Sequence, residues 1–126
     1  MVNFEILELN EDIRLNSERL VELYVQLGQA GAQDVVCRAM EELAVRFKQL
    51  AMDYNNQDYK AVRKCAKSMV GIAEQVGMQC LADVAQDVRR CAENYDTVAL
   101  AATLARLLRI GDKSLTAIWD SQDLSV

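Results

Sequence analysis

The sequence predicts an all-α protein, an up-down-up-down four-helix bundle preceded by an additional N-terminal helix. Apolar residues recur at spacings of three and four along almost the whole chain, which is the pattern of amphipathic helices. There is no proline and there are only five glycines, so little interrupts long helices. The apolar residues are mainly Ala, Leu, Val and Met, and aromatic residues make up only 6% of the chain, which favours helices over sheets.

A chain of 126 residues is expected to form one domain, 1–126, with an N-terminal helical extension over 1–30 and the bundle over 33–121. We expect the first helix over 5–27, with a break allowed near Asn10 or Asn16. Gly28 and Gly31 should end it, because glycine accepts the left-handed conformation that closes helices. The apolar side of this helix comprises Ile6, Leu9, Ile13, Leu20, Tyr24 and Leu27.

The bundle is expected to consist of helices over 33–54, 59–76, 78–93 and 97–121. Residues 55–58 form a turn, and Asp58 can cap the next helix by accepting backbone N–H bonds. Gly77 ends that helix, residues 94–96 form another turn, and Gly111 marks a kink or an end in the last helix. Connections this short place consecutive helices antiparallel.

Each bundle helix has an apolar stripe that is expected to face the core. On the helix over 33–54 the stripe is Val36, Met40, Leu43, Phe47, Leu50 and Tyr54. On the helix over 78–93 it is Met78, Leu81, Ala85, Val88 and Ala92. On the helix over 97–121 it is Val98, Ala101, Leu104, Leu108, Leu115 and Ile118.

Charge and cysteine content narrow the classes of function. The net charge is −5 and the pI is about 4.7, whereas nucleic acid attracts clustered Lys and Arg, so we expect no nucleic-acid partner. No apolar run approaches the ~20 residues that span a bilayer, and the N-terminus lacks the basic region of a signal peptide. We therefore expect a cytoplasmic protein without a membrane partner. The cysteines lack CxxC spacing and there is no histidine, so we expect reduced core thiols, no metal and no cofactor; the four are Cys37, Cys65, Cys80 and Cys91.

The helix over 59–76 carries the main functional signal. At ~100° per residue it separates into two faces. The apolar face comprises Val62, Cys65, Ala66, Met69, Ile72, Ala73 and Val76. The opposite face, which we call the basic ridge, comprises Lys60, Arg63, Lys64, Lys67, Val70, Gly71 and Glu74. An acidic protein thus places four positive charges on one face, followed by a valine expected to be exposed and by a glycine.

Gly71 is unusual on the basic ridge, because a mid-helix glycine costs about 1 kcal/mol relative to alanine. Close helix packing could explain it on a core-facing position but not on a solvent-facing one. The remaining functional explanation is that another molecule approaches the backbone there. The alternative is that Gly71 has no role and the lysines form an ordinary solvated face.

The stretch from Ala66 to Gly77 resembles part of the histidine phosphotransfer (HPt) domains. These four-helix bundles relay phosphoryl groups between response-regulator receiver domains. Their second bundle helix carries a His-x-Leu-Lys-Gly pattern followed six residues later by a second glycine. Four residues here fit that register: Ser68, Met69, Gly71 and Gly77. The resemblance in helix order and length extends over about residues 33–121.

Two departures from the HPt pattern decide the chemistry. Lys67 stands where the family has its phosphorylated histidine, and Val70 stands where it has the accompanying lysine. A neutral imidazole is nucleophilic near pH 7, whereas an exposed lysine side chain is protonated and is not. The chain has no histidine that could act instead. Phosphate transfer by the family mechanism is therefore excluded.

The resemblance implies a binding module without catalysis. HPt domains dock their histidine helix over the acidic pocket of a receiver domain. Lys67, extended by Lys64 and Lys60, would bring positive charge to such a pocket, and Gly71 would let the partner come close. We therefore expect the basic ridge to bind a response-regulator receiver domain or another signalling protein.

Two other classes of function were weighed. One is a structural or regulatory interaction protein that acts as a homodimer or an adaptor through its N-terminal helix. The other is an enzyme, which we do not expect, because Glu-x-x-His pairs and glycine-rich phosphate loops are absent. Trp119 and the tail 120–126 could dock a partner, although a C-terminal tryptophan more often closes the end of a bundle. Four carboxylates fall on polar faces where solvation explains them: Glu41, Glu42, Asp83 and Asp87.

Overall fold

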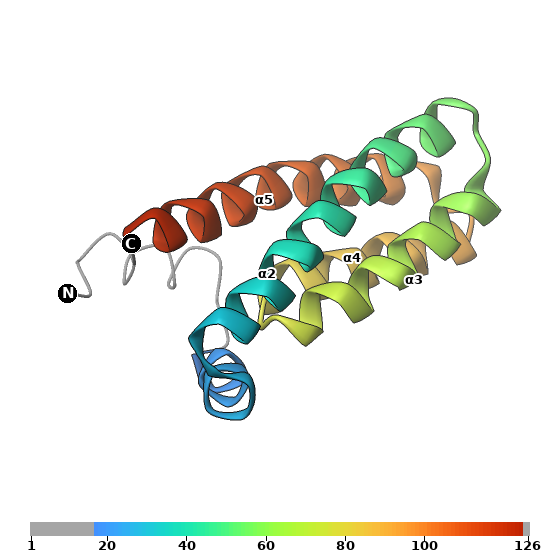
Figure 1. Ribbon diagram of the computed structural model, residues 1–126. Coiled ribbons are helices and arrows are strands. Elements are labelled where there is room, and N and C mark those ends of the chain that lie inside the picture. Colours follow the sequence, from blue (N-terminus) through green and yellow to red (C-terminus); the bar gives the residue numbers. More distant parts are fainter. Residues whose placement is uncertain (1–16, 125–126) are drawn as a thin grey trace.

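Four helices follow one another along the part of the chain that the structure describes. The computed structural model describes the backbone of residues 17–124 and the side chains of residues 18–113 and Thr116. Its helices are α2 (Ser17–Asn55), α3 (Tyr59–Gln75), α4 (Gln79–Glu93) and α5 (Thr97–Leu124). No strand occurs within residues 17–124, and the prediction of an all-α fold is confirmed for them. α3 packs on both α2 and α4, α5 packs on α4, and α2 also contacts α5 (Figure 1).

The long helix α2 is broken at Gly28. Gly28 has φ 73° and ψ 175°, so the backbone leaves the helical region there and the helix changes direction (Figure 1). The predicted end at Gly28 is confirmed, whereas Gly31 does not end a helix but lies inside the next one. The second helix was expected from residue 33, yet it resumes directly after Gly28. A single left-handed glycine is enough to redirect the chain, so no loop is needed. The breaks considered at Asn10 and Asn16 lie outside the described residues.

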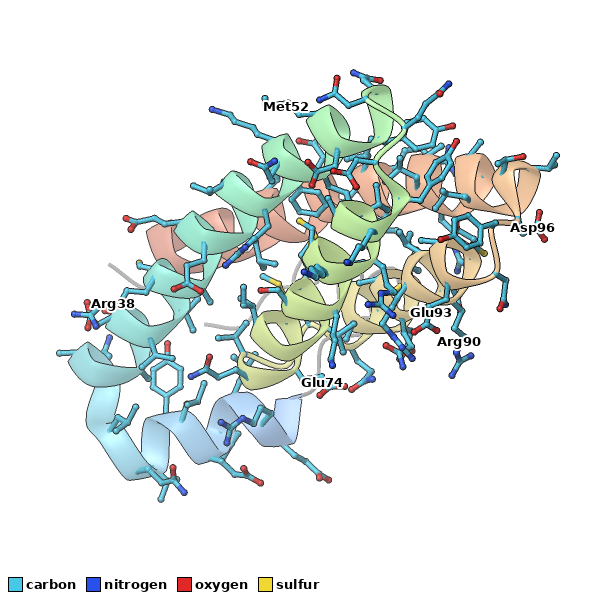
Figure 2. All side chains as sticks on the ribbon, turned by 90° about the vertical axis from the view of Figure 1, so that its right-hand side faces the viewer. Arg38, Met52, Glu74, Arg90, Glu93 and Asp96 are labelled. Atoms are coloured by element: carbon cyan, nitrogen blue, oxygen red, sulfur yellow. The ribbon has the colours of Figure 1, made fainter. Side chains whose placement is uncertain are left out.

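The segment of α2 before the break, 17–27, lies across the end of the bundle near the α3–α4 turn (Figure 2). Leu23 is buried in the core, and Arg19 Nε donates a hydrogen bond to the Gln75 carbonyl oxygen at 2.9 Å. The expected apolar stripe is wrong for two of its members, because Tyr24 and Leu27 are exposed. The segment crosses the bundle end and buries only a narrow arc around Leu23. Ile6, Leu9 and Ile13 of that stripe lie outside the described residues.

The core stripes predicted for the helices over 33–54, 59–76 and 78–93 are confirmed with few exceptions. On α2, Phe47 and Tyr54 are half-buried and pack against the core, while the other four residues of the stripe are buried. On α3 only Ile72 is half-buried, and on α4 the whole stripe is buried. The largest fully buried side chains are Leu43, Leu50, Met69, Met78, Leu81, Leu100 and Leu107, followed by four valines.

On α5 the predicted core face is wrong. Leu100, Leu104 and Leu107 are buried, whereas Val98 and Leu108 are exposed. Ala101 is exposed as well, so only Leu104 of the described stripe faces the core. The helix is apolar over a wide arc, and two registers with three- and four-residue spacing fit it equally well. Leu115 and Ile118 lie outside the described side chains. Gly111 neither kinks nor ends the helix, which continues to Leu124.

The turns between α2 and α3, α3 and α4, and α4 and α5 were predicted correctly. Asp58 Oδ1 accepts a hydrogen bond from the Ala61 N–H at 3.1 Å, which caps α3. Gly77 has φ 77° and follows the end of α3. The turn before α5 contains Tyr95 at φ 53°, and Asp96 Oδ1 accepts a hydrogen bond from the Ala99 N–H at 3.1 Å. None of the described helices is long and apolar enough to cross a membrane.

Candidate functional site

The two faces of α3 are set by its apolar stripe. Five of its residues are buried within the helix itself, and Val76, which ends it, is fully buried. Burying this stripe between α2 and α4 turns the opposite side of α3 toward solvent. The basic ridge is therefore a consequence of where the core lies. The buried residues of α3 are Val62, Cys65, Ala66, Met69 and Ala73.

Most of the basic ridge is exposed as predicted. The exposed members are Lys60, Lys64, Lys67, Gly71 and Glu74. Arg63 is half-buried, and so is Val70, which packs against the core. The expectation of an exposed valine at position 70 is therefore wrong. Val70 lies at the border between the two faces of α3, where the packing of neighbouring helices covers part of its side chain.

Three lysines dominate the charge of the basic ridge. Lys60, Lys64 and Lys67 have neither an ion pair nor a side-chain hydrogen bond among the described residues. Glu74 lies towards the C-terminal end of α3, beside the 17–27 segment (Figure 2). The positive charge is thus concentrated on the first two thirds of the helix, where it is open to solvent and to a partner.

Gly71 faces open space. A Cβ added there would meet no atom within 4 Å outside its own helical turn. Close packing within this chain therefore does not require a glycine, and an alanine would fit without any rearrangement. The prediction that internal packing cannot explain Gly71 is confirmed.

α4 contributes two charged residues that the sequence analysis missed. Arg63 Nη1 lies 3.5 Å from Glu93 Oε1, and Arg89 Nη1 lies 3.2 Å from the same oxygen. Arg89 Nε also donates a hydrogen bond to Gln86 Oε1 at 3.1 Å. Figure 2 shows Glu93 between α3 and α4 and Arg90 farther out on α4. The spacing of Arg89 and Glu93 by four residues could have indicated an exposed pair on α4, but not that Arg63 joins it.

Two adjoining clefts follow the seam between α3 and α4. The first has a volume of about 220 Å³ and is lined by Arg63, Lys64, Lys67, Arg89 and Glu93. The second, of about 230 Å³, shares Arg63 and Glu93 and is otherwise lined by Tyr59, Lys60, Ala92 and Tyr95. Tyr59 and Tyr95 meet edge to face with ring centroids 6.4 Å apart. The basic ridge is therefore one wall of a longer cationic seam.

The prediction of core thiols is confirmed for Cys65 and Cys80, whereas Cys37 and Cys91 are half-buried. None of the four cysteines is in a disulfide. Burial raises the pKa of the Cys65 thiol, and nearby Asp53 adds to the rise while Arg46 opposes it. Cys65 Sγ donates to the Arg46 carbonyl oxygen at 3.3 Å. A protonated, buried thiol of this kind is a core residue and a poor nucleophile.

The carboxylates singled out in the sequence do not form a common site. Glu41 and Glu42 are exposed on α2, whereas Asp83 and Asp87 are half-buried on α4. α2 and α4 do not pack against each other. Within the described residues, no group of three or more Cys, Asp or Glu side chains could hold a metal ion. The side chain of Trp119 and the tail 120–126 lie outside the described side chains.

Comparison with known proteins adds no relative. A scan against protein-family models and searches of curated proteins and of solved structures gave no match to this chain. Its function must therefore be argued from its own residues.

Proposed function

We propose that this chain is a cytoplasmic, non-catalytic HPt-like signalling module that binds a response-regulator receiver domain, or a related two-component protein, without transferring phosphate. The proposal includes an up-down-up-down arrangement for the helices within 33–121. It is supported by short turns between the helices and by packing of each helix on the next, with α2 also touching α5. Thiols outside disulfides fit a reducing compartment.

The observation that carries the proposal is the exposed basic ridge with a bare backbone at Gly71. Lys67 occupies the position that resembles the family's phosphorylated histidine, and it is exposed and without an ion pair among the described residues. One helical turn farther on, Gly71 leaves the backbone uncovered. A fixed positive charge beside an open backbone suits docking against an acidic pocket. The complete absence of histidine means that the same face cannot carry phosphate on an imidazole.

The direct test is a binding assay against purified receiver domains from the same organism. Lys67→Glu reverses the charge at the centre of the basic ridge and should weaken binding at least tenfold, because like charges would meet at the interface. Lys48→Glu is the matched control: Lys48 is exposed on α2 beside Leu108 and Asp112 of α5 rather than beside α3, and its replacement should leave binding within twofold. Equal binding by wild type and Lys67→Glu, or no binding to any receiver, would contradict the proposal.

A second experiment tests whether the docking geometry resembles that of the family. The variant K67H/V70K restores the two family residues and should accept a phosphoryl group from a phosphorylated receiver. K67H alone is the companion variant, because Val70 packs against the core and its replacement can disturb folding. A folded K67H variant that binds the receiver but remains unphosphorylated would show that the resemblance is confined to architecture.

A second candidate function is a homodimer or adaptor that acts through the N-terminal part of the chain. It is favoured by exposed apolar side chains on the 17–27 segment of α2: Val21, Tyr24, Val25 and Leu27. Deleting residues 1–30 would be a poor test, because Leu23 belongs to the core. V21E/V25E is sharper, since both side chains are exposed. Sedimentation should then show a dimer for the wild type and a monomer for the variant.

A further inference from the structure

The cleft between α3 and α4 has an excess of positive charge. Its lining consists of four cationic side chains, Arg63, Lys64, Lys67 and Arg89, and one carboxylate, Glu93. Three positive charges are therefore left without compensation in a cleft of about 220 Å³. The chain as a whole carries −5, so the excess is a local property of this seam. Like charges gathered at one place are unfavourable unless an anion joins them.

The cationic groups come from two helices and are partly pre-positioned. Arg89 is held by hydrogen bonds to Gln86 Oε1 at 3.1 Å and to Glu93 Oε1 at 3.2 Å. Arg63, from the facing helix, reaches the same Glu93 oxygen at 3.5 Å. A single carboxylate oxygen thus lies near two guanidinium groups. Two guanidinium groups placed in this way can bind an oxyanion with more oxygens and more charge better than they bind one carboxylate.

The cleft is also large enough for such a ligand. A water molecule occupies about 30 Å³ of liquid volume, so a tetrahedral oxyanion and several waters fit in it. The adjoining cleft shares Arg63 and Glu93, and Tyr59 and Tyr95 line it farther along. A group attached to the oxyanion can therefore leave along the seam without meeting the core.

We propose that the α3–α4 cleft is a binding site for a phosphate group, held by Arg63 and Arg89 with Lys64 and Lys67 at its open side. A phosphate dianion balances most of the excess charge, and guanidinium groups match its oxygens. The inference goes beyond receiver binding: it shares Lys64 and Lys67 with the basic ridge, but it needs Arg89 and the cleft and does not need Gly71. The phosphate can be free or carried by a phosphorylated side chain, and the experiment separates the two.

The test is calorimetric titration of the full chain at constant ionic strength with three probes. These are inorganic phosphate, a neutral-ended Gly-phosphoserine-Gly peptide, and the same peptide with aspartate in place of phosphoserine. The wild type should bind phosphate or the phosphoserine peptide at one saturable site and the aspartate peptide at least tenfold more weakly. Binding of inorganic phosphate at least as tight as that of the phosphoserine peptide indicates free phosphate, and tighter or exclusive binding of the peptide indicates a phosphorylated protein. Absence of saturable binding to either, or an aspartate peptide that binds within twofold, would overturn the proposal.

Variants locate the site. The double variant K64Q/K67Q should weaken phosphate binding about tenfold or more, since each of its two substitutions removes a charge-assisted contact with the phosphate. R38Q/K48Q removes the same charge from exposed positions on α2 and should keep the affinity within twofold. If both double variants lost the same phosphate affinity, the loss would come from the change in net charge, and that result would refute the site.

Whether replacing Glu93 strengthens or weakens phosphate binding distinguishes a phosphate site from a cluster that only stabilises the seam. E93Q removes the negative charge that competes with phosphate for Arg63 and Arg89 but keeps an Oε1 acceptor for their hydrogen bonds, so phosphate binding should strengthen severalfold. If Glu93 only organised the seam, its loss would weaken binding, and that result would contradict the proposal. G71Q, outside the cleft, should leave phosphate binding unchanged while blocking a receiver. The two proposals can therefore fail separately.

Discussion

Gly71 and Gly111 both lie in the middle of a helix, but their surroundings differ completely. A Cβ added at Gly71 on the basic ridge would meet nothing within 4 Å, whereas a Cβ added at Gly111 would collide with the ring of Phe47. Gly111 is buried where α5 approaches α2. Both glycines cost the helix a similar amount. The difference shows that the fold itself accounts for Gly111. At Gly71 either a binding partner requires the glycine or the glycine has no role.

The largest effect should come from filling the space at Gly111. Gly111→Ala forces the half-buried Phe47 ring out of its place, so the protein should lose about 1–3 kcal/mol of stability despite the better helix propensity of alanine. Urea unfolding measures this. In a Phe47→Ala background the same substitution should cost much less, because the ring is gone. A G111A protein more stable than wild type would remove the contrast between the two glycines.

The opposite sign is expected at Gly71. Gly71→Ala should stabilise the chain by up to about 1 kcal/mol, because alanine is the better helix former and no atom obstructs its Cβ. Urea unfolding again gives the value. If receiver binding weakens in the same variant, stability and binding are in conflict at this position, as expected for a glycine kept for a partner. Destabilisation by G71A would show that an internal constraint had been overlooked.

The core face of α3 can be examined through Cys65. Burial raises the pKa of this thiol in the folded state, so its protonated form is favoured by folding. The corresponding stability is present below the thiol's ordinary pKa of 9.0 and is lost as the pH rises through the higher folded value. The unfolding free energy of the wild type should therefore fall more steeply than that of Cys65→Ala as the pH rises through and above 9.0. If the unfolding free energies of the two proteins fell equally steeply with pH, the Cys65 thiol would not be shielded from water in the folded state.

The smallest effect on stability is expected at the centre of the basic ridge. Lys67→Glu should change the free energy of unfolding by less than about 0.5 kcal/mol, because Lys67 is exposed and has no ion pair among the described residues. Thermal and urea unfolding check this directly. A larger loss would mean that the ridge contributes to the fold, which would weaken the contrast with Gly111 and the case for a binding role.

Much of the architecture followed from local patterns. The stripes of α3, of α4 and of the part of α2 after Gly28 needed only helical spacing, and the caps at Asp58 and Gly77 and the break at Gly28 needed only backbone chemistry. α5 did not follow, since it is apolar over a wide arc and its buried face depends on where α4 and α2 meet it. Gly111 was misread as a kink for the same reason: the ring that it accommodates belongs to another helix.

The basic ridge was predictable and the cleft beside it was not. The spacing of Lys60, Lys64 and Lys67 puts them on one face of any helix that buries the opposite stripe. The prediction failed at Val70, whose position at the edge of that face let the neighbouring packing cover it. Arg89 and Glu93 were missed because they belong to a different helix, and only packing sets which of its residues face α3.

The sequence by itself therefore determined the helices, most of their core faces, the absence of histidine chemistry and the charge of the basic ridge, because each depends on residue identity and on neighbours within one helical turn. Only the tertiary structure decided which face of α5 is buried, why Gly111 is a glycine, and that Arg63 shares Glu93 with Arg89 across a cleft. These features join residues far apart in the chain. Their distances are fixed by how helices pack, which no single helix encodes.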